Sequence, residues 1–382
     1  MKNKIFIILI AIAILLKLSL FIFAELHAPQ AKFLIDTKWY LDSAEGLADY
    51  GAFARLENSE LQYEFYRTPG YPFFLYLFHF LFKVPLAGII FLQIILSVAG
   101  AYFVYRTAAL IDPRLSKLSA LIILFDPAIT IHSLLLLSET LFLFFISLGA
   151  WLFIKYLKEN QLSALLWTAL ALVAATYVKP ISYYLGFFLA LFMFVKLSRT
   201  NLKKFLGHTL FFLLIVYVCL GIWQYRNYTH FKRPLFCSAN SPSDVKSYGL
   251  AGKYAREGNI QGTLPLHYYS QETARCLLEL LTNPGSFKYF NSDPLKKLGK
   301  VIGYPWIILV MIGFVAGLTK IKRETALQFL ALIAFYFITT SILAAPEDID
   351  SRFRIPMMPF AAGLSAYGWI KILQNNKGQA NF

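Results

Sequence analysis

The stretch Ile5–Ala24 reads IFIILIAIAILLKLSLFIFA, an apolar run broken only by Lys17. A helix of about 20 apolar residues can cross the roughly 30 Å hydrocarbon core of a bilayer. Lys2 and Lys4 precede the run, as in a signal peptide, but the following Ala24-Glu25-Leu26 lacks the small-x-small pattern of a cleavage site. We therefore expect an uncleaved first membrane span, with Lys17 reaching outward to the membrane surface. The alternative for Lys17 is contact with a lipid phosphate.

Similar apolar runs recur along the whole chain. Hydrophobic residues make up 58% of the sequence, charged residues only 15%, and the mean hydropathy is +0.57. A soluble domain needs a more polar surface than this. The sequence predicts an all-α polytopic membrane protein with about ten transmembrane helices. The expected spans are 5–24, 86–105, 118–133, 139–154, 162–178, 181–195, 205–223, 301–319, 325–343 and 355–370.

Basic residues are concentrated in the short loops on one side of these spans. If the N-terminus is cytoplasmic, the inner segments hold sixteen Lys and Arg residues but only three Asp and Glu residues. This asymmetry follows the positive-inside rule and predicts that both termini are cytoplasmic. It also accounts for most of the +15 net charge. The charge is therefore a topology signal, and no basic face for nucleic acid is visible.

The same topology places the large polar segments, near 25–72 and 224–300, on the outer face, followed by a short outer loop at 346–354. A helix is expected across Tyr268–Thr282. We expect three parts, namely an N-terminal transmembrane module (1–223) whose first outer loop (25–85) is catalytic, an outer subdomain (224–300), and C-terminal transmembrane helices (301–382).

The second outer segment also contains two of the three cysteines, Cys237 and Cys276. A pair of cysteines in one polar segment predicts a disulfide only weakly. The sequence leaves open whether these two residues are joined.

The first outer loop has the most informative local pattern. Asp36, Tyr40 and Ala44 lie four residues apart, so they share one face of a short amphipathic helix. The run Pro69-Gly70-Tyr71-Pro72 predicts a rigid turn that breaks any helix. Phe73–Phe82 is apolar but too short to span a bilayer, which favours an interfacial or re-entrant helix.

Several short motifs then follow one another at the expected outer ends of spans. They are Tyr66-Arg67-Thr68-Pro69-Gly70-Tyr71-Pro72, Ser138-Glu139-Thr140-Leu141, Lys179-Pro180, Trp223-Gln224-Tyr225-Arg226-Asn227-Tyr228 and Arg352-Phe353-Arg354-Ile355-Pro356-Met357-Met358-Pro359. With Asp36 just beyond the first span, their order resembles that of the lipid-carrier-dependent glycosyltransferases of GT-C fold. The pattern is most similar to bacterial members of the protein O-mannosyltransferase and aminoarabinose-transferase superfamily. The resemblance implies a GT-C-like bundle.

The resemblance also implies a reaction. Members of this family transfer a sugar from an undecaprenyl- or dolichyl-phosphate donor to an acceptor outside the cytoplasm, usually with inversion. It therefore implies a hexosyltransferase-type enzyme of the bacterial cytoplasmic (inner) membrane with its active site on the outer face. Its partners would be the polyprenyl-phosphate-linked donor, membrane lipids and a lipid, glycan or protein acceptor. The sequence identifies neither the sugar nor the acceptor.

In such a reaction a base must take the proton of the acceptor hydroxyl, and a positioned carboxylate can do so. By resemblance, Asp36 is the residue on which the reaction depends. The alternative is that Asp36 is an ordinary solvated acid beside the membrane. Glu139 is a second candidate, because a carboxylate at or in the membrane is costly and usually functional or paired. Its alternative is a helix-capping role with Ser138.

The departing phosphate gains charge, which fixed cations would stabilise. Arginine binds phosphate through a planar fork and lysine as a point charge. The alternative for each cation is anchoring at the membrane interface. The candidates at outer span ends are Arg67, Lys179, Arg226, Arg352 and Arg354.

Two departures from the family pattern affect these expectations. Lys179 stands where the family usually has Arg, and no second acid follows Asp36 to form an Asp-x-Asp metal pair. A divalent metal therefore remains an alternative to a metal-free reaction. The mid-span pair Asp126-Pro127 predicts a helix break or polar pairing rather than catalysis.

A transporter or flippase of lipid-linked sugars and a noncatalytic membrane assembly protein are the rival functions. A transporter would show Gly- or Pro-broken spans at matching positions of two halves. Here the informative residues concentrate in the outer loops instead.

Overall fold

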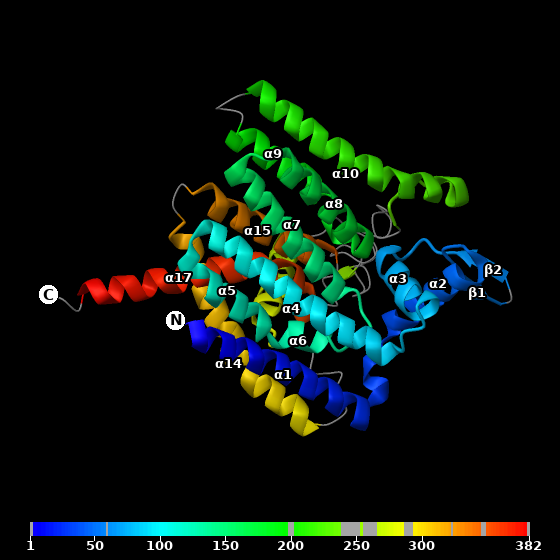
Figure 1. Ribbon diagram of the computed structural model, residues 1–382, viewed down its shortest axis with the longest axis horizontal. Helices are drawn as coiled ribbons and strands as arrows, with labels where there is room; N and C mark the ends of the chain where they lie inside the picture. The colour runs from blue at the N-terminus through cyan, green and yellow to red at the C-terminus, as the bar shows by residue number, and fades with distance from the viewer. Residues whose placement is uncertain are drawn as a thin grey trace.

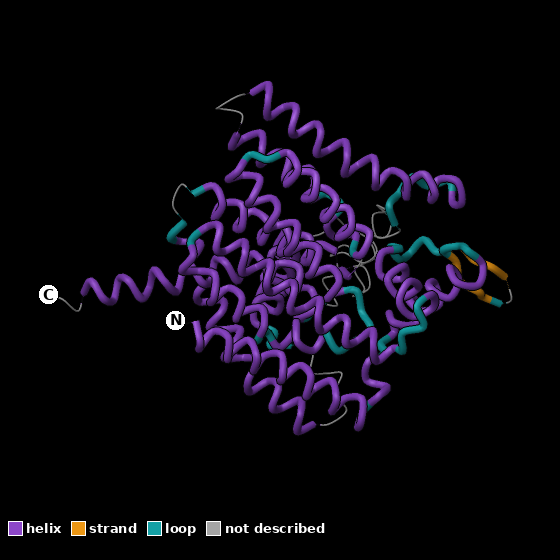
Figure 2. The backbone as a smooth tube through the Cα atoms, viewed as in Figure 1, coloured by secondary structure: helices purple, strands orange, loops and turns teal. Residues whose placement is uncertain are grey.

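The structure is a computed structural model that describes residues 3–58, 60–197, 202–237, 253–254, 266–285, 293–321, 324–344 and 349–379. Nearly all of this part of the chain is helical, and its two strands form one short hairpin (Figure 2). The expectation of an all-α membrane protein is confirmed. The Gly-rich stretch 249–262 lies almost wholly outside the described residues.

The helices and strands follow one another without a repeated unit. The first half contains α1 (Asn3–His27), η1 (Pro29–Lys32), α2 (Ile35–Tyr50), β1 (Ala54–Glu57), β2 (Glu60–Tyr63), α3 (Gly70–Leu75), η2 (Tyr76–Leu81), α4 (Leu86–Ile111), α5 (Pro113–Leu124), α6 (Pro127–His132), α7 (Glu139–Glu159) and α8 (Leu162–Val178). The second half contains η3 (Pro180–Ser182), α9 (Leu185–Leu197), α10 (Leu202–Phe231), α13 (Leu266–Thr282), α14 (Asp293–Thr319), α15 (Thr325–Ala344), α16 (Ser351–Arg354), η6 (Ile355–Met357) and α17 (Met358–Gln379).

The long helices form one bundle, with the first outer loop at one end of it. In Figure 1, α2, α3, β1 and β2 gather at the right, whereas the start of α1 and the end of α17 lie at the left. Helices α14 and α17 cross at close range. A Cβ added to Gly368 would lie only 2.0 Å from the Gly313 carbonyl oxygen. Small residues of this kind let membrane helices approach closely.

Six helices in the described part of the chain are long and apolar enough to cross a membrane. They are Asn3–His27, Leu86–Ile111, Glu139–Glu159, Leu202–Phe231, Gly299–Thr319 and Thr325–Leu343. Leu162–Val178 and Pro180–Lys196 are shorter apolar segments. The number of ten crossings therefore stays a prediction.

The expected span at 118–133 is interrupted. Helix α5 ends at Leu124 and α6 begins at Pro127, with the Asp126 side chain accepting a hydrogen bond from the Ile129 N–H over 2.9 Å. The helix break predicted at Asp126-Pro127 is confirmed, because proline lacks the N–H that a continuous helix would need. Helix α6 ends at His132, at the end of the expected span.

The outward orientation expected for Lys17 is wrong. Its side chain is buried, and Nζ donates a hydrogen bond to Thr130 Oγ1 over 3.0 Å. The reason is that α1 turns this position toward α6, where a hydroxyl acceptor is present. Lys17 therefore joins α1 to the bundle instead of extending to the membrane surface.

The first outer loop contains the expected amphipathic helix, α2, but the proline-rich run behaves differently from the prediction. Pro69–Pro72 starts helix α3, which begins at Gly70. Proline is tolerated in a first helical turn because the N–H groups there have no partner within the helix. A Cβ on Gly70 would lie 2.6 Å from the backbone carbon of Tyr177, so glycine is needed where α3 meets the end of α8.

Two further features concern the outer segments. The β1–β2 hairpin pairs Arg55 with Gln62 in antiparallel register, and the sequence analysis did not predict it. Helix α13 occupies Leu266–Thr282, as expected. Cys237 and Cys276, both among the described residues, form no disulfide with each other.

The contact at Gly70 gives a stability prediction. Gly70→Ala should lower the free energy of unfolding by about 1–3 kcal/mol, because the added Cβ must displace backbone atoms of α8. Gly207→Ala is the control, since nothing lies within 4 Å of its added Cβ. Thermal unfolding of the detergent-purified variants measures both effects, and equal melting temperatures would contradict the close approach.

Candidate active site

Asp36 lies near the start of α2, where the exposed N–H groups of a helix favour a negative charge. Both of its carboxylate oxygens are paired with arginines. Arg67 Nη2 donates to Oδ1 over 2.6 Å, and Arg352 Nη1 lies 2.7 Å from Oδ2. Arg67 and Arg352, which are far apart in the sequence, thus both contact Asp36, the acid predicted from the sequence.

Glu139 forms the second half of the same cluster. It is the first residue of α7, and its side chain is 1% exposed. Lys179 Nζ donates to Glu139 Oε1 over 2.8 Å, and Arg352 Nε donates to the same oxygen. Arg352 therefore bridges the two acids. We call Asp36, Arg67, Glu139, Lys179 and Arg352 the charged cluster.

Helix α2 is held against the segment that leads into α7. Thr37 Oγ1 donates to the Leu136 carbonyl over 3.0 Å, and the Leu136 N–H donates to the Lys32 carbonyl over 3.1 Å. The Tyr40 and Ser138 hydroxyls share a hydrogen bond of 3.3 Å. These bonds fix Asp36 beside Glu139, which directly follows Ser138.

The cations are positioned by equally local contacts. Thr68 Oγ1 donates to the Val178 carbonyl over 3.0 Å, which places Arg67 beside Lys179. The Asp350 side chain accepts from the Arg352 N–H over 2.7 Å and so caps the short helix α16.

The tyrosines of the first-loop motif support the cluster from beneath. The rings of Tyr40 and Tyr71 meet edge to face at 5.0 Å. The Tyr71 hydroxyl donates to Gln93 Oε1 over 2.7 Å, and Gln93 Nε2 donates to the Leu135 carbonyl over 2.6 Å. The remaining motif residues, Pro69, Gly70 and Pro72, lie at the start of α3 instead of contacting the acids.

The electrostatics favour the ionised forms of Asp36 and Arg352. Burial would raise the pKa of Asp36, but the positive charges of Arg352 and Arg67 outweigh burial and hold that pKa below its ordinary value. Burial would lower the pKa of Arg352, but the carboxylates of Glu139 and Asp36 raise it well above its usual value. Three cations and two anions leave one positive charge in excess, which suits an anionic ligand.

Two of the predicted cations lie outside the cluster. Arg226 donates to the Glu64 and Phe53 carbonyls, each over 2.7 Å, and its guanidinium carbon is 4.8 Å from the Trp223 ring centroid. It thereby ties α10 to the hairpin region of the first loop. Arg354 is fully buried and donates to the Leu280 carbonyl over 3.2 Å, at the end of α13.

Sequence reasoning missed Glu64. Its buried Oε1 accepts hydrogen bonds from the backbone N–H groups of Tyr66 and Arg67, the latter over 3.2 Å. This carboxylate therefore fixes the turn that presents Arg67 to Asp36. The signal was the acid three residues before Arg67, a spacing that allows a side chain to cap a turn.

The described residues offer no ready metal site. No three His, Cys, Asp or Glu side chains in this part of the chain come together as metal ligands. Asp36 and Glu139 instead face basic groups, which compete with a metal for the carboxylate oxygens. The arrangement does not fit a divalent ion held by the protein alone.

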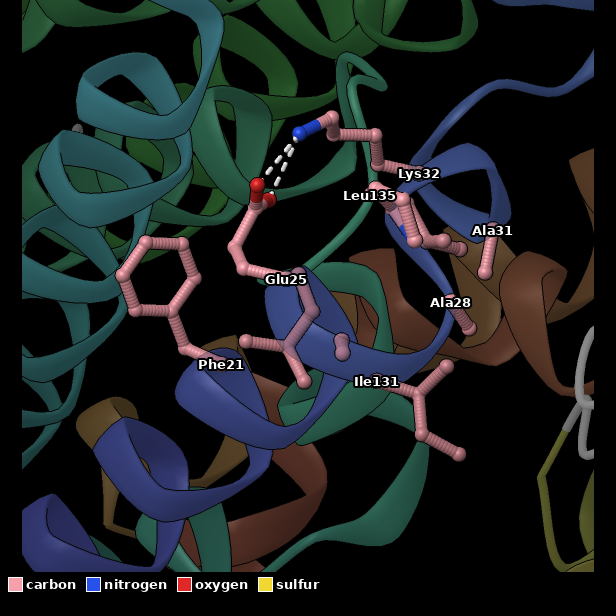
Figure 3. A pocket seen from close by; sticks show the side chains of 10 residues that line it. Phe21, Glu25, Ala28, Ala31, Lys32, Ile131 and Leu135 are labelled. Atoms are coloured by element: carbon pink, nitrogen blue, oxygen red, sulfur yellow. Dashed lines mark hydrogen bonds and ion pairs between the residues drawn. The ribbon is translucent and has the colours of Figure 1, made fainter.

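A small pocket lies between α1, η1 and the segment that joins α6 to α7. Figure 3 shows Phe21 of α1 and Ile131 of α6 on its walls, with Glu25 and Lys32 paired at 2.6 Å beside it. Leu135, another wall residue, is close in sequence to Glu139. The pocket and the charged cluster thus share one segment of the chain.

The chain is similar to known proteins in part of its sequence and in its fold. Residues 66–223 match the family described as dolichyl-phosphate-mannose-protein mannosyltransferase. The archaeal oligosaccharyltransferase AglB from Archaeoglobus fulgidus, in complex with an inhibitory peptide and a dolichol-phosphate, superposes with a TM-score of 0.58. The chain has the GT-C fold.

The GT-C match is one of fold and not of close sequence. Identity to the peptide complex is 13%, with 97% of this chain and 50% of that chain covered. The Archaeoglobus fulgidus oligosaccharyltransferase in complex with Zn and sulfate superposes with a TM-score of 0.61 at 14% identity. The match covers 96% of this chain and 49% of that chain. This GT-C chain thus spans about half the length of these solved structures. No curated protein matches it.

The bridging position of Arg352 predicts a large loss of stability on its removal. Arg352→Met leaves the Glu139 and Asp36 carboxylates without a shared partner and should cost about 3 kcal/mol or more. Arg114→Met is the control, because it breaks the exposed pair with Asp112 and should change stability little. Denaturation midpoints of the purified variants test this, and equal midpoints would contradict the bridge.

Proposed function

We propose that this protein is a membrane glycosyltransferase that moves a sugar from a polyprenyl-phosphate donor to a hydroxyl group of an extracytoplasmic acceptor. The observation that carries this proposal is the charged cluster, in which two carboxylates meet three cations beside the first loop. The GT-C fold and the family match over residues 66–223 support it. One of the matched solved structures contains a dolichol-phosphate.

The three cations of the cluster are the proposed phosphate-binding groups. Arg67 and Arg352 offer planar guanidinium forks, and Lys179 adds a compact charge. They would stabilise the charge that grows on the departing polyprenyl phosphate as its bond to the sugar breaks. The excess positive charge of the cluster favours such an anion over a neutral ligand.

Asp36 is the proposed general base. The acceptor oxygen forms a bond to the anomeric carbon, the bond from that carbon to the phosphate oxygen breaks, and the acceptor proton passes to Asp36. A single displacement of this kind inverts the anomeric centre. Glu139 would act differently, because its buried carboxylate holds Lys179 and Arg352 in place.

The paired state of Asp36 has a mechanistic consequence. Each of its oxygens accepts from one arginine, so the two guanidinium groups already hold the carboxylate. A donor phosphate would compete for the same guanidinium groups and thereby release a carboxylate oxygen. Donor binding would then precede activation of the base.

The arrangement of the described ends of the chain fits an active site on the outer face. Both ends of the chain lie opposite the first outer loop, as expected if both termini are cytoplasmic (Figure 1). The bacterial inner membrane is the location that the family resemblance implies, and we propose it for this protein.

The assignment of Asp36 predicts that Asp36→Asn reduces sugar transfer by about 10²-fold or more, because the amide cannot accept the proton. The variant should still bind the donor, since the cations remain. Asp49→Asn on the exposed end of α2 is the matched control. Transfer from a radiolabelled polyprenyl-phosphate sugar measures activity, and wild-type activity in Asp36→Asn would remove the residue from its role.

The lowered pKa of Asp36 predicts the acid side of the pH profile. Since the depressed pKa keeps Asp36 ionised in weak acid, kcat/KM for the acceptor should fall only at a pH below the ordinary titration range of an aspartate. Arg67→Met removes a charge that lowers this pKa, so the fall should move to higher pH. Lys38→Met, an exposed neighbour on α2, should leave the profile in place. A profile unaffected by Arg67→Met would mean that another group titrates.

A further inference from the structure

Two aromatic side chains stand next to the charged cluster without belonging to it. Trp39 lies three residues after Asp36, hence on the same side of α2. Tyr66 directly precedes Arg67, and its ring centroid is 6.5 Å from that of Trp39 at an interplanar angle of 62°. Tyr66 is 63% exposed. We call these two rings the aromatic corner, which opens beside Asp36.

The aromatic corner is held from behind. The Arg55 guanidinium carbon lies 3.8 Å from the centroid of the Trp39 ring, and Arg55 Nε lies 3.8 Å from Glu64 Oε2. The other oxygen of Glu64 accepts from the N–H groups of Tyr66 and Arg67. One buried carboxylate therefore fixes both the exposed ring and the cation that pairs with Asp36. Side chains pre-positioned in this way lose little freedom when a ligand binds.

The surroundings of the aromatic corner indicate what it would bind. A sugar ring presents C–H groups on its faces and hydroxyl groups around its rim. Aromatic rings provide flat apolar surface for such a face, and Arg55, Asp36 and Arg67 provide charged hydrogen-bonding groups for the rim. A lipid chain would instead require a continuous apolar wall, which these charged groups interrupt.

We propose that the aromatic corner is the acceptor subsite and that it stacks on a sugar ring, which makes the acceptor a carbohydrate-containing molecule. The inference rests on the proposed glycosyltransferase function and names its acceptor class. A sugar ring stacked on Tyr66 with its edge toward Trp39 would hold a neighbouring hydroxyl toward Asp36, the proposed base.

Direct binding without donor tests the subsite. The probes are the methyl glycosides of glucose, galactose and mannose, followed by saturation-transfer NMR on the detergent-purified full chain. At least one should bind, and Tyr66→Ala should weaken its binding about tenfold, or about 1.4 kcal/mol. Tyr66→Phe should bind like the wild type because the ring is kept. Tyr50→Ala is the control, since Tyr50 is similarly exposed at the end of α2.

The transfer assay gives a second measurement. With the same glycoside as acceptor, Tyr66→Ala should raise the acceptor KM about tenfold while leaving kcat nearly unchanged. Failure of all three glycosides to bind would overturn the proposal. Unchanged glycoside binding and unchanged acceptor KM in Tyr66→Ala would also overturn it. The same holds if the protein transfers sugar to a serine-containing peptide and Tyr66→Ala leaves that transfer unaffected.

The two proposals fail in distinguishable ways. Glycoside binding that depends on Tyr66, without consumption of a polyprenyl-phosphate sugar by the wild type, would reject the glycosyltransferase and keep the carbohydrate site. Donor consumption by the wild type, with transfer indifferent to Tyr66, would keep the enzyme and reject the acceptor subsite.

Discussion

The guanidinium of Arg352 is the contact on which the rest of the site depends. It pairs with Asp36 on α2 and with Glu139 at the start of α7. Burying a carboxylate without a partner is costly, and one planar cation that serves two acids removes that cost at both. The three residues come from the beginning, middle and end of the chain. The cluster can therefore form only once the bundle has brought their helices together.

The two acids of the cluster differ in access to solvent, and this difference separates their roles. The side chain of Asp36 is 18% exposed, whereas that of Glu139 is 1% exposed. A proton acceptor must be reached by its substrate, so exposure favours Asp36. Glu139 is better placed to fix the cations. Neighbouring carboxylates in an active site can take different roles when the protein gives them different environments.

Much of this arrangement could be predicted from the sequence, since the signals were local. Long apolar runs indicated the membrane helices, and the spacing of Asp36, Tyr40 and Ala44 indicated α2. The placement of Arg67 and Lys179 beside span ends indicated cations near the acids. The loop charges indicated that both termini share one side of the membrane, which the arrangement in Figure 1 allows.

Other features could not be predicted, because they depend on packing. Arg352 and Arg354 look equivalent in the sequence, but a short helix directs the first toward Asp36 and buries the second against the end of α13. Glu64 accepts hydrogen bonds from backbone N–H groups. Almost every residue has such a group, so no pair of side chains in the sequence marks the role of Glu64. The strands of the hairpin are four residues long, too short for alternation to distinguish them from a loop.

The hydrogen bond between Lys17 and Thr130 has a consequence for the geometry of the whole site. A uniformly apolar helix surrounded by lipid has no preferred rotation about its own axis, because lipid solvates every face of the helix equally well. The Lys17–Thr130 hydrogen bond, partway along α1, favours one rotation of this helix. The buried Ala13 on the same helix packs against the bundle as well. A lysine remote from the reaction thus helps to fix the rotation of the helix that leads, through η1, to the proposed base.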